Sequence, residues 1–419
     1  MRVLMLAQFY PPVSGGEERH VRNLSIDLVR RGHDVAVITT GQPGSQSGEI
    51  EDGVKVYRLR GTVQRTDAFF YNTSHRQVPP FPDPELLYGM RQIVLREKPD
   101  VVHAHNWLLH SYLPLKPLSG APLVCTLHDF SLICAKKNAL YEGKVCTGPA
   151  LTKCLACAAR HYGIFKGSLT AAANWGSWAI EGKRVDAFIA VSKAVAEGNR
   201  LDRLGTPYHV IPNFVPDDIA MFEPEPHGLL QNLPNAGYIL FVGDLDYKKG
   251  VSVLLEAYSA LENAPPLVLI GRPCPTMPAA IPPGVSVFYE WPHSAVMHAW
   301  KRCLFGVLPS ICADACPTVI MEAMASGKAV AATAIGGIPD LVVHAESGLL
   351  VPPADVQSLT SALRTLIGNP ELRQGMASAA LGKVEMLKAK SVVPRIERLY
   401  ERLLSPGRLL ALGEAQNAA

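Results

Sequence analysis

Residues 3–39 decide the fold, and they read VLMLAQFYPPVSGGEERHVRNLSIDLVRRGHDVAVIT. Residues 3–7 and 35–39 are short apolar runs of strand length. Between them, residues 17–31 carry Val21, Leu24 and Leu28 at helical spacing, and Gly32 follows as a stop signal. A strand, a helix and a second strand in this order predict two parallel strands joined by a crossover helix.

The same alternation fills the rest of the chain. The further expected elements are strands at 101–102, 123–127, 187–191, 208–211, 238–242, 267–270, 305–308 and 329–332, and helices at 192–204, 250–261, 317–326 and 391–404. Residues 213–237 break the pattern with four prolines and read as a linker. We therefore expect an α/β protein with two Rossmann-like domains facing across a cleft, and a C-terminal helix that packs back toward the N-terminal domain. The expected boundaries are an N-terminal domain at 1–213 with a cysteine-rich insert at 129–160, a linker at 214–236, a C-terminal domain at 237–390, and a helix with tail at 391–419.

Composition narrows the class of protein. The chain has 419 residues, of which 48% are hydrophobic and 18% charged, which suits two or three full-sized domains. The formal net charge of +3 gives no reason to expect nucleic acid as a partner. The N-terminal apolar run is too short for a secretion signal, and no apolar run reaches 18 residues, so we expect a cytoplasmic protein with reduced thiols.

A second informative stretch is 308–330, LPSICADACPTVIMEAMASGKAV. A strand is expected to end near Leu308, Asp314 lies on the following loop, and Pro317 suits the first position of a helix. Unpaired amides from Thr318 onward would make an anion site at that helix start, with Glu322 one turn further on. Two acidic residues at this spacing are, without further evidence, more often a loop residue and a solvated helix residue. A functional interpretation therefore depends on the surrounding sequence.

That context resembles the large family of retaining glycosyltransferases built from two Rossmann-like domains (GT-B architecture), number four in the usual classification. The resemblance covers nearly the whole chain, and the family's E-x7-E donor motif reads D-x7-E here, from Asp314 to Glu322. It implies that Asp314 contacts hydroxyls of the donor sugar and Glu322 the ribose. The donor-binding residues implied in this segment are Asp314, Ala315, Cys316, Thr318, Val319 and Glu322.

The resemblance also implies the reaction. A hexosyl group would pass from a UDP- or GDP-type donor to a glycan, lipid-linked or small-molecule acceptor, with retention and with no catalytic cofactor. This would be a step of cell-envelope or glycan biosynthesis. The sequence does not name the sugar, the base or the acceptor. Two alternatives stay open, a sugar-nucleotide epimerase on the same fold and a non-catalytic nucleotide-sugar binder.

A third motif, FVGDLDYKKG, places Gly243 at a strand end and Lys249 at a helix start. A lysine there can neutralise a leaving diphosphate, and the family has a lysine in this place, so Lys249 is a predicted catalytic residue and Gly243 a donor-binding one. Asp244 stands where the family has arginine, and it would oppose the chemistry unless it faces away or pairs with Lys248. The loop Gly336–Gly337 also resembles a family loop of the same GG-x-P type.

The N-terminal half offers further candidates. Gly15 and Gly16 lie between the first strand and its helix, and by the resemblance they border the donor phosphates. His128 follows the strand at 123–127 in the place where the family has a catalytic histidine against the donor sugar. His103 and His105 end the neighbouring strand, where we expect a loop lining the cleft in preference to a metal site.

Two features lie outside these motifs. Cys134, Cys146, Cys154 and Cys157 fall within 24 residues, and they are candidates for a structural zinc site or for ordinary reduced thiols. The stretch 160–203 holds seven Lys/Arg and four Asp/Glu with nearby aromatic residues, which would suit either a solvated face or a weak peripheral contact with the inner face of the membrane.

Overall fold

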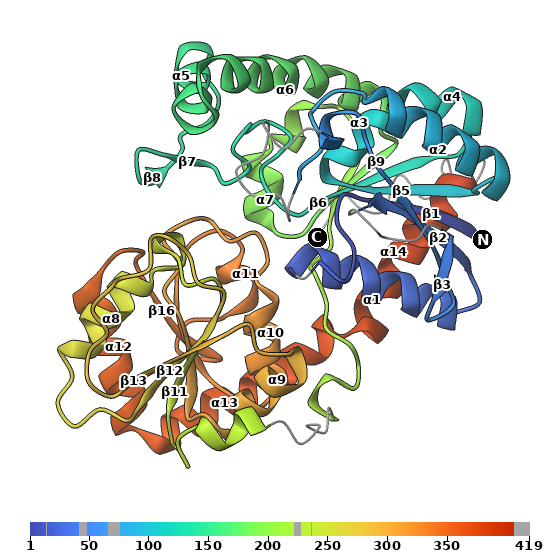
Figure 1. Cartoon of the computed structure of the whole chain (residues 1–419). Helices are drawn as coiled ribbons and strands as arrows, with labels where there is room; N and C mark the ends of the chain where they lie inside the picture. The colour runs from blue at the N-terminus through green and yellow to red at the C-terminus, as the bar shows by residue number, and fades with distance from the viewer. Residues whose placement is uncertain (14, 42–47, 66–75, 222–227, 236, 406–419) are drawn as a thin grey trace. The chain divides into compact units, whose positions relative to one another are not determined.

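The computed structural model describes residues 1–13, 15–41, 48–65, 76–221, 228–235 and 237–405. The chain divides into two compact units, one made of Met1–Pro212 with Val392–Ala419 and the other of Asn213–Ser391. We call them the first and the second unit. Each has a mostly parallel sheet with helices packed on it (Figure 1). The predicted fold class, two Rossmann-like α/β units, is confirmed.

The sheet of the first unit has the strand order β10-β9-β6-β5-β1-β2-β4-β3 among the described residues. All neighbours are parallel except β3 and β4. Its strands are β1 (Arg2–Ala7), β2 (Asp34–Thr40), β3 (Glu49–Glu51), β4 (Val54–Leu59), β5 (Val101–His105), β6 (Leu123–Leu127), β9 (Ala187–Ala190) and β10 (Tyr208–Val210). The central strands are buried along their length, as expected where helices cover both faces of a parallel sheet.

The helices of the first unit connect these strands. They are α1 (Gly16–Arg30), α2 (Pro84–Glu97), α3 (Leu109–Tyr112), α4 (Lys116–Ser119), α5 (Leu151–Tyr162), α6 (Ile164–Arg184) and α7 (Lys193–Gly198). The side chain of Asp83 caps α2 by accepting from the amides of Glu85 and Leu86, and Pro84 takes the first helical position. The residues between Tyr141 and Lys144, hairpin-like in sequence, join the two short strands β7 (Leu140–Tyr141) and β8 (Lys144–Val145).

The second unit has a sheet of parallel strands in the order β13-β12-β11-β14-β15-β16. The strands are β11 (Ile239–Val242), β12 (Leu267–Gly271), β13 (Val285–Tyr289), β14 (Phe305–Leu308), β15 (Val330–Thr333) and β16 (Gly348–Val351). The helices are α8 (Val251–Ser259), α9 (His293–Arg302), α10 (Thr318–Ala325), α11 (Ile338–Leu341), α12 (Val356–Gly368) and α13 (Pro370–Val384). Apolar residues of α8, α12 and the strands form one buried core.

Two of the expected segments take a different form in the structure. The helix expected at 192–204 breaks into α7 and a 3₁₀ turn at Leu201–Arg203, because Arg200 adopts a positive φ of 53°. The expected linker belongs to the second unit, where Val215 exchanges backbone hydrogen bonds with Leu387 and Ala389. Residues 222–227 and 236 of the expected linker lie outside the described residues; in the described part, these backbone hydrogen bonds tie Val215 to the second unit.

The last helix, α14 (Ala389–Leu404), contributes its residues from Val392 onward to the first unit. Val393, Ile396 and Leu399 are buried as the helical spacing predicts. Tyr400 is fully buried as well. The helix contacts the first sheet at β5, where the hydroxyl of Tyr400 lies 2.6 Å from Nδ1 of His103.

Candidate active site

Asp314 is held by two neighbours on the second unit. The loop after β14 brings Ser310 and Asp314 together, and the Ser310 hydroxyl donates to Oδ2 of Asp314 at 2.5 Å. The ammonium of Lys249 pairs with Oδ1. The Asp314 side chain is 12% exposed and that of Lys249 is 32% exposed. A carboxylate offers about four acceptor positions, so Asp314 keeps capacity for a ligand hydroxyl.

A tight turn delivers Lys249 to this position. Residues Tyr247–Lys249 form a 3₁₀ turn that the side chain of Asp246 caps, and Gly250 ends it with φ of 75°. A Cβ on Gly250 would lie 1.9 Å from the carbonyl oxygen of Pro309, so only glycine lets the two loops approach this closely. Burial lowers the pKa of Lys249, but Asp314 outweighs it and raises the pKa to about 12. The ammonium is therefore a permanent charge.

The backbone of Asp314 rests on the double glycine. Gly336 has φ of 59°, and a Cβ there would lie 2.3 Å from the carbonyl oxygen of Asp314. The amide of Gly337 donates to the same oxygen at 2.7 Å. The loop predicted from its GG pattern thus acts as a support for the loop that carries Asp314.

The helix that follows is α10, and its first turn has the features that favour an anion. Pro317 precedes the helix in extended conformation, and Thr318 is the first helical residue. The amides of Thr318 and Val319 belong to the first turn, where no intrahelical carbonyl is available, and the helix dipole adds positive potential. Gly327, with φ of 66°, follows the end of the helix. The helix therefore begins one residue later than predicted, with Pro317 before its first turn and not in it.

Glu322 lies one turn into α10 and is 3% exposed at its side chain. Its Oε1 lies 2.9 Å from Nε2 of His293, the first residue of α9. A buried carboxylate needs hydrogen-bonding partners, and His293 supplies one that sequence reasoning missed. Nothing in the local sequence of His293 marks it, because it comes from a different helix.

Asp244 has a different partner from the one the sequence suggested. It pairs with Arg272, directly after β12, through two bonds of 2.8 and 3.1 Å (Nε to Oδ1 and Nη2 to Oδ2). Pairing with Lys248 was one of the two alternatives that the sequence left open; the backbone carbonyl of Lys248 accepts from the amides of Ile311 and Cys312. Asp244, which stands where the family has arginine, is thus paired with the guanidinium of Arg272.

The remaining predicted donor-binding residues of this segment are Gly243, Ala315 and Cys316, and their role stays a prediction. Gly243 adopts φ of 155° and its amide donates to Ile270 at 3.0 Å. Ala315 is partly exposed beside Asp314. Cys316 is buried, which raises the pKa of its thiol to about 12, and its carbonyl accepts from Asn213 at 3.1 Å. A thiol in this state is not a nucleophile at neutral pH.

On the first unit, Gly15 and Gly16 open α1. Gly15 is extended (φ −171°), and a Cβ on Gly16 would meet nothing within 4 Å, so the space outside this turn is open. The first turn also carries Glu17 and Glu18. A carboxylate in this first turn opposes an anion at the helix start. The phosphate role of the two glycines stays a prediction.

His128 follows β6 and lies among other histidines. Its Nε2 is 2.9 Å from Nδ1 of His105, the last residue of β5. The ring of His20, from α1, lies edge-on to it with centroids 4.9 Å apart. The sequence did not indicate His20 as a site residue, because it lies within an amphipathic helix, where it is buried.

A second polar group lies beside these rings. Glu17 accepts from the side-chain amide of Asn106 at 2.7 Å, and the ammonium of Lys137 lies 4.0 Å from the ring centroid of Trp107. Burial, then the charges of Glu18 and Asp129, raises the pKa of Glu17 to about 8. Burial also raises the pKa of Asp129 and lowers that of Lys137. Such groups can bind and orient hydroxyls.

The four predicted zinc cysteines behave differently from one another. Burial raises the pKa of Cys134, and backbone amides of Ala139, Lys136 and Lys137 surround its sulfur. Cys154 and Cys157 lie in or at the first turns of α5. Within the described ranges, the group of three or more metal-ligating side chains with gathered donor atoms is His20, His105 and His128, and no three of these cysteines meet that criterion. The thiols are thus not preassembled, and zinc binding stays a prediction.

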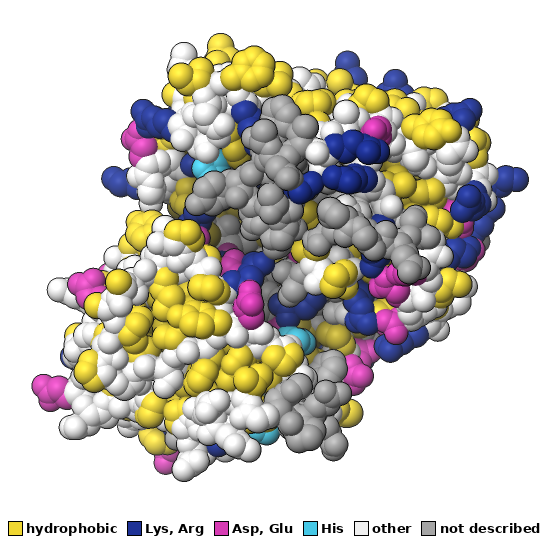
Figure 2. All heavy atoms as spheres, in the orientation of Figure 1, with side chains coloured by type: hydrophobic (Ala, Val, Ile, Leu, Met, Phe, Trp, Pro, Cys, Tyr) yellow, Lys and Arg dark blue, Asp and Glu magenta, His cyan; other side chains and the backbone are white. Residues whose placement is uncertain are grey.

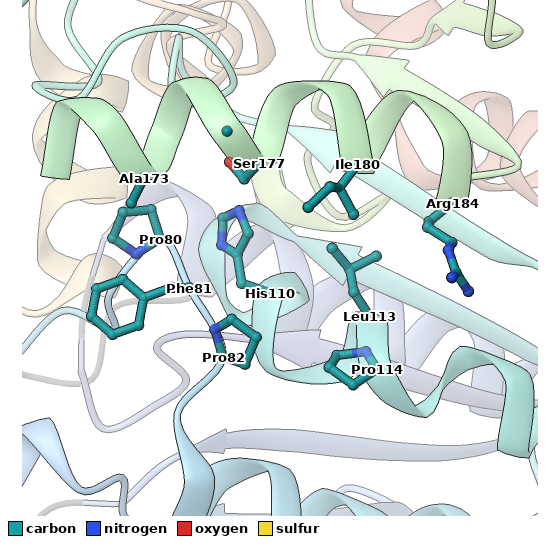
Figure 3. A pocket seen from close by; sticks show the side chains of 11 residues that line it. Pro80, Phe81, Pro82, His110, Leu113, Pro114, Ala173, Ser177, Ile180 and Arg184 are labelled. Atoms are coloured by element: carbon teal, nitrogen blue, oxygen red, sulfur yellow. The ribbon is translucent and has the colours of Figure 1, made fainter. Parts of the chain in front are cut away.

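A cavity of about 360 Å³ lies elsewhere on the first unit, and it contains none of the predicted residues (Figure 3). His110 points toward α6 in its wall, and its Nε2 lies 2.9 Å from the buried carboxylate of Glu181. The other lining residues are Pro80, Phe81, Pro82, Leu113, Pro114, Ala173, Gly176, Ser177, Ile180 and Arg184.

In the part of the chain that the structure describes, no helix is both long and apolar enough to cross a bilayer.

Comparisons with known proteins agree with this organisation. The family model for glycosyltransferase family 4 matches residues 14–219, and the model for glycosyl transferases group 1 matches residues 236–369. A glycogen synthase of Mycobacterium tuberculosis is 26% identical over 91% of this chain and 89% of its own length. A phosphatidyl-myo-inositol mannosyltransferase of Mycolicibacterium smegmatis is 25% identical over 100% of this chain and 98% of its own length.

Solved structures share the fold at low identity. Sucrose-phosphate synthase from Thermosynechococcus elongatus superposes with a TM-score of 0.73 at 18% identity, covering 97% of this chain and 99% of its own. The Anabaena protein HepE in complex with UDP-glucose has a TM-score of 0.66 at 18% identity, covering 97% of this chain and 100% of its own.

Proposed function

This chain belongs to the glycosyltransferases of family 4 with the GT-B fold, and from that premise we propose that it transfers a hexosyl group, with retention, from a UDP- or GDP-type donor to a hydroxylated acceptor. The observation that supports the donor most is the arrangement on the second unit. The ammonium of Lys249 pairs with Asp314, and the loop that carries Asp314 leads directly into the helix that begins at Thr318.

Each part of the arrangement has a role in this proposal. The first-turn amides of α10 bind the diphosphate, and Lys249 leaves Asp314 to neutralise the charge that develops as the diphosphate departs. Asp314, once released, accepts from hydroxyls of the sugar. Glu322, oriented by His293, accepts from the ribose. His128 contacts the reacting sugar, by the family resemblance.

The replacement of the family's arginine by Asp244 motivated the non-catalytic alternative. Because Asp244 is neutralised by Arg272 in a two-bond pair, the acid does not stand alone near the phosphates. This observation favours an enzyme over a mere binder. For the acceptor, we propose that Glu17, Asp129 and Lys137 of the first unit bind its hydroxyl groups.

The experiment is a thermal-shift screen of nucleoside diphosphates and nucleotide sugars, followed by turnover of those that bind. A ligand that binds only the folded state raises the unfolding temperature. We expect a shift with UDP or GDP and slow release of the diphosphate from the matching sugar donor. Clean epimer formation would support the epimerase, and tight binding with no turnover for any acceptor would support the binder.

We further propose a weak peripheral contact with anionic lipid at the start of α6. Ile164 and Phe165 are each 83% exposed and Lys166 follows them. Figure 2 shows hydrophobic side chains gathered over α5 and α6, with lysine and arginine side chains beside them. Co-sedimentation with anionic vesicles tests this, with Phe165→Ser as the variant and Leu372→Ser, an exposed leucine of α13, as the control. Equal binding of both variants, or none by the native chain at low salt, would count against it.

A further inference from the structure

A cavity of about 190 Å³ lies between the last helix and the edge strand of the first sheet. One side of it is the carboxyl end of β10, and the other side is α14. The lining residues include His209, Val210, Arg395, Arg398, Leu399 and Arg402. All of them belong to the first unit, and none is a predicted site residue. The cavity thus shares no residue with the groups proposed for the donor and the acceptor.

Three arginines dominate the helix side of this cavity. Arg395, Arg398 and Arg402 are three and four residues apart, so they lie on one face of α14. Arg395 is fixed against the sheet, because its Nη2 donates to the backbone carbonyl of Val210 at 2.8 Å. A guanidinium has five N–H donors, so the other donors of Arg395 remain for a ligand. The helix and the edge strand thus place three guanidinium groups around one small cavity.

No carboxylate pairs with these cations in the part of the chain that the structure describes. The three arginines form no ion pair there, and neither does His209. Glu397, on the same helix, pairs instead with Arg31 and His33, just after α1. Glu401, the next acid of the helix, forms no ion pair with the arginines either. The cluster is therefore a concentration of positive charge without a partner of opposite sign among the described residues.

This unbalanced charge is reflected in two pKa values. Burial, and then the charge of Arg398, lowers the pKa of Arg395. Burial, followed by the charges of Arg402 and Arg395, lowers the pKa of His209. The positive groups therefore repel one another around the cavity, and a bound anion would offset this repulsion.

A solvated helix face is the simplest explanation of exposed arginines, but it accounts well for only one of the three. Arg402 lies in the last turn of α14, where the helix dipole favours a cation. Arg395 and Arg398 lie nearer the middle of the helix, and like charges at these spacings destabilise a helix. A solvated face also requires neither a cavity nor a guanidinium fixed beside it. An anionic ligand explains all three arginines together.

From this arrangement we propose that Arg395, Arg398 and Arg402 form a binding site for a phosphate group, separate from the donor site. The planar guanidinium matches a phosphate with two parallel hydrogen bonds. A phosphomonoester carries about −1.5 to −2 charges at neutral pH, which suits several cations better than a single carboxylate does. The site follows from these residues alone and does not rest on the proposed function.

The size of the cavity limits what it can hold. Pockets for whole small molecules begin at roughly 300 Å³, and this cavity is smaller. It therefore fits the charged end of a larger molecule. The phosphate group can belong to a soluble phosphomonoester or to the headgroup of phosphatidate.

The first test is thermal unfolding and calorimetric titration with inorganic phosphate, with chloride at equal ionic strength and acetate as control anions. A ligand that binds only the folded state raises the unfolding temperature, so we expect a rise with phosphate that neither control anion matches. Arg398→Gln/Arg402→Gln removes two cations and leaves the bond between Arg395 and Val210 in place. Loss of one hydrogen bond to a charged group weakens binding about 10-fold, so the double variant should bind phosphate about 100-fold more weakly.

The matched control is Arg91→Gln, which removes an exposed arginine of α2 in the same unit. It should bind phosphate as the native chain does. Phosphate bound at the start of α10 would contribute equally in all three proteins, so the difference between them reports this site alone, whether or not the proposed function holds. Equal phosphate affinity in the double variant and in Arg91→Gln would overturn the proposal, as would a native chain that responds equally to phosphate and chloride.

His209 gives a second readout that a folding defect does not imitate. An anion beside the ring favours its protonated form, so phosphate should raise the pKa of His209. The ring-proton resonance in NMR measures this, with His209→Gln to assign it. In the double variant, phosphate should leave the titration of His209 unchanged. A native His209 that titrates identically with and without phosphate would contradict the site.

Two arms of the experiment identify the source of the phosphate group. Binding to phosphatidylcholine vesicles only when they contain phosphatidate, with weaker binding by the double variant, would assign a lipid headgroup. Glycerol 3-phosphate that binds more tightly than inorganic phosphate, with equal vesicle binding by both proteins, would assign a soluble phosphomonoester. The contact proposed at the start of α6 is present in both proteins, so it does not affect this comparison.

Discussion

The ion pair between Lys249 and Asp314 gives the most demanding prediction, through the substitution Lys249→Met. Methionine keeps the length and volume of the stem but removes the charge. Of the two partners of Asp314, Ser310 and Lys249, only Ser310 then remains. A negative carboxylate without its ammonium partner would lie next to the place proposed for the diphosphate. We expect weaker binding of nucleoside diphosphate and a slower reaction.

The magnitudes differ for stability, binding and rate. Asp314 is only 12% exposed, so loss of its ammonium partner leaves a mostly buried carboxylate, and we expect the free energy of unfolding to fall by about 1–3 kcal/mol. A hydrogen bond to a charged group is worth about 1.5–3 kcal/mol, which corresponds to roughly 10- to 150-fold weaker binding of UDP or GDP. Loss of a group that stabilises developing charge costs about 10²–10³ in kcat.

The assay pairs calorimetric titration of the diphosphate and of the free nucleoside with release of diphosphate from the sugar donor. The nucleoside should bind equally well to both proteins, because Lys249 acts on the phosphates. Lys248→Met, the exposed neighbour in the same turn, is the matched control. The double variant Lys249→Met/Asp314→Asn should regain part of the diphosphate affinity, because the repelling charge is gone. A Lys249→Met protein that turns over like Lys248→Met would refute the reasoning.

Three further outcomes are expected. Glu322→Gln should weaken UDP and uridine binding by about 10-fold alike, measured by the same titration; a loss confined to the diphosphate would contradict its ribose role. Gly250→Ala should destabilise the chain by about 1–3 kcal/mol in urea unfolding, because of its φ of 75° and the contact with Pro309, whereas Gly375→Ala, in open helix surface, should not. The pKa of Glu17 is raised to about 8 in the folded chain. Between about pH 4.5 and 8 the folded state therefore keeps a proton that the unfolded state has lost, and the free energy of unfolding falls as pH rises through this range. Glu17→Gln should flatten this fall in thermal unfolding, and an unchanged profile would contradict the burial argument.

The central strands of both sheets were predictable because each is a bounded apolar run, and the helix at Thr318 because clear start and stop signals enclose it, whereas β4, β13 and β16, nearer the sheet edges, were not predicted. The local sequence of the predicted elements carries the whole signal, from the buried β1 to the glycine stop after α10. The two acids of the D-x7-E motif were also placed correctly relative to the helix, since loop and helix are adjacent in sequence.

The partners of these residues were not predictable in the same way. Ser310, His293 and Arg272 come from three different elements, and none of them stands in a periodic pattern. Sheet topology brings β12 and β14 to either side of β11, which is why residues distant in sequence meet at one edge. The helices α5 and α6 were missed because their apolar residues are partly exposed and form no regular buried stripe.

The most direct measurement of the central claim is a crystal structure of the protein with the nucleoside diphosphate that binds best in the thermal-shift screen. We expect the diphosphate on the amides of Thr318 and Val319, the ribose hydroxyls on Glu322, and Lys249 moved from Asp314 to a phosphate oxygen. A nucleotide bound elsewhere, with the pair of Lys249 and Asp314 unchanged, would contradict it.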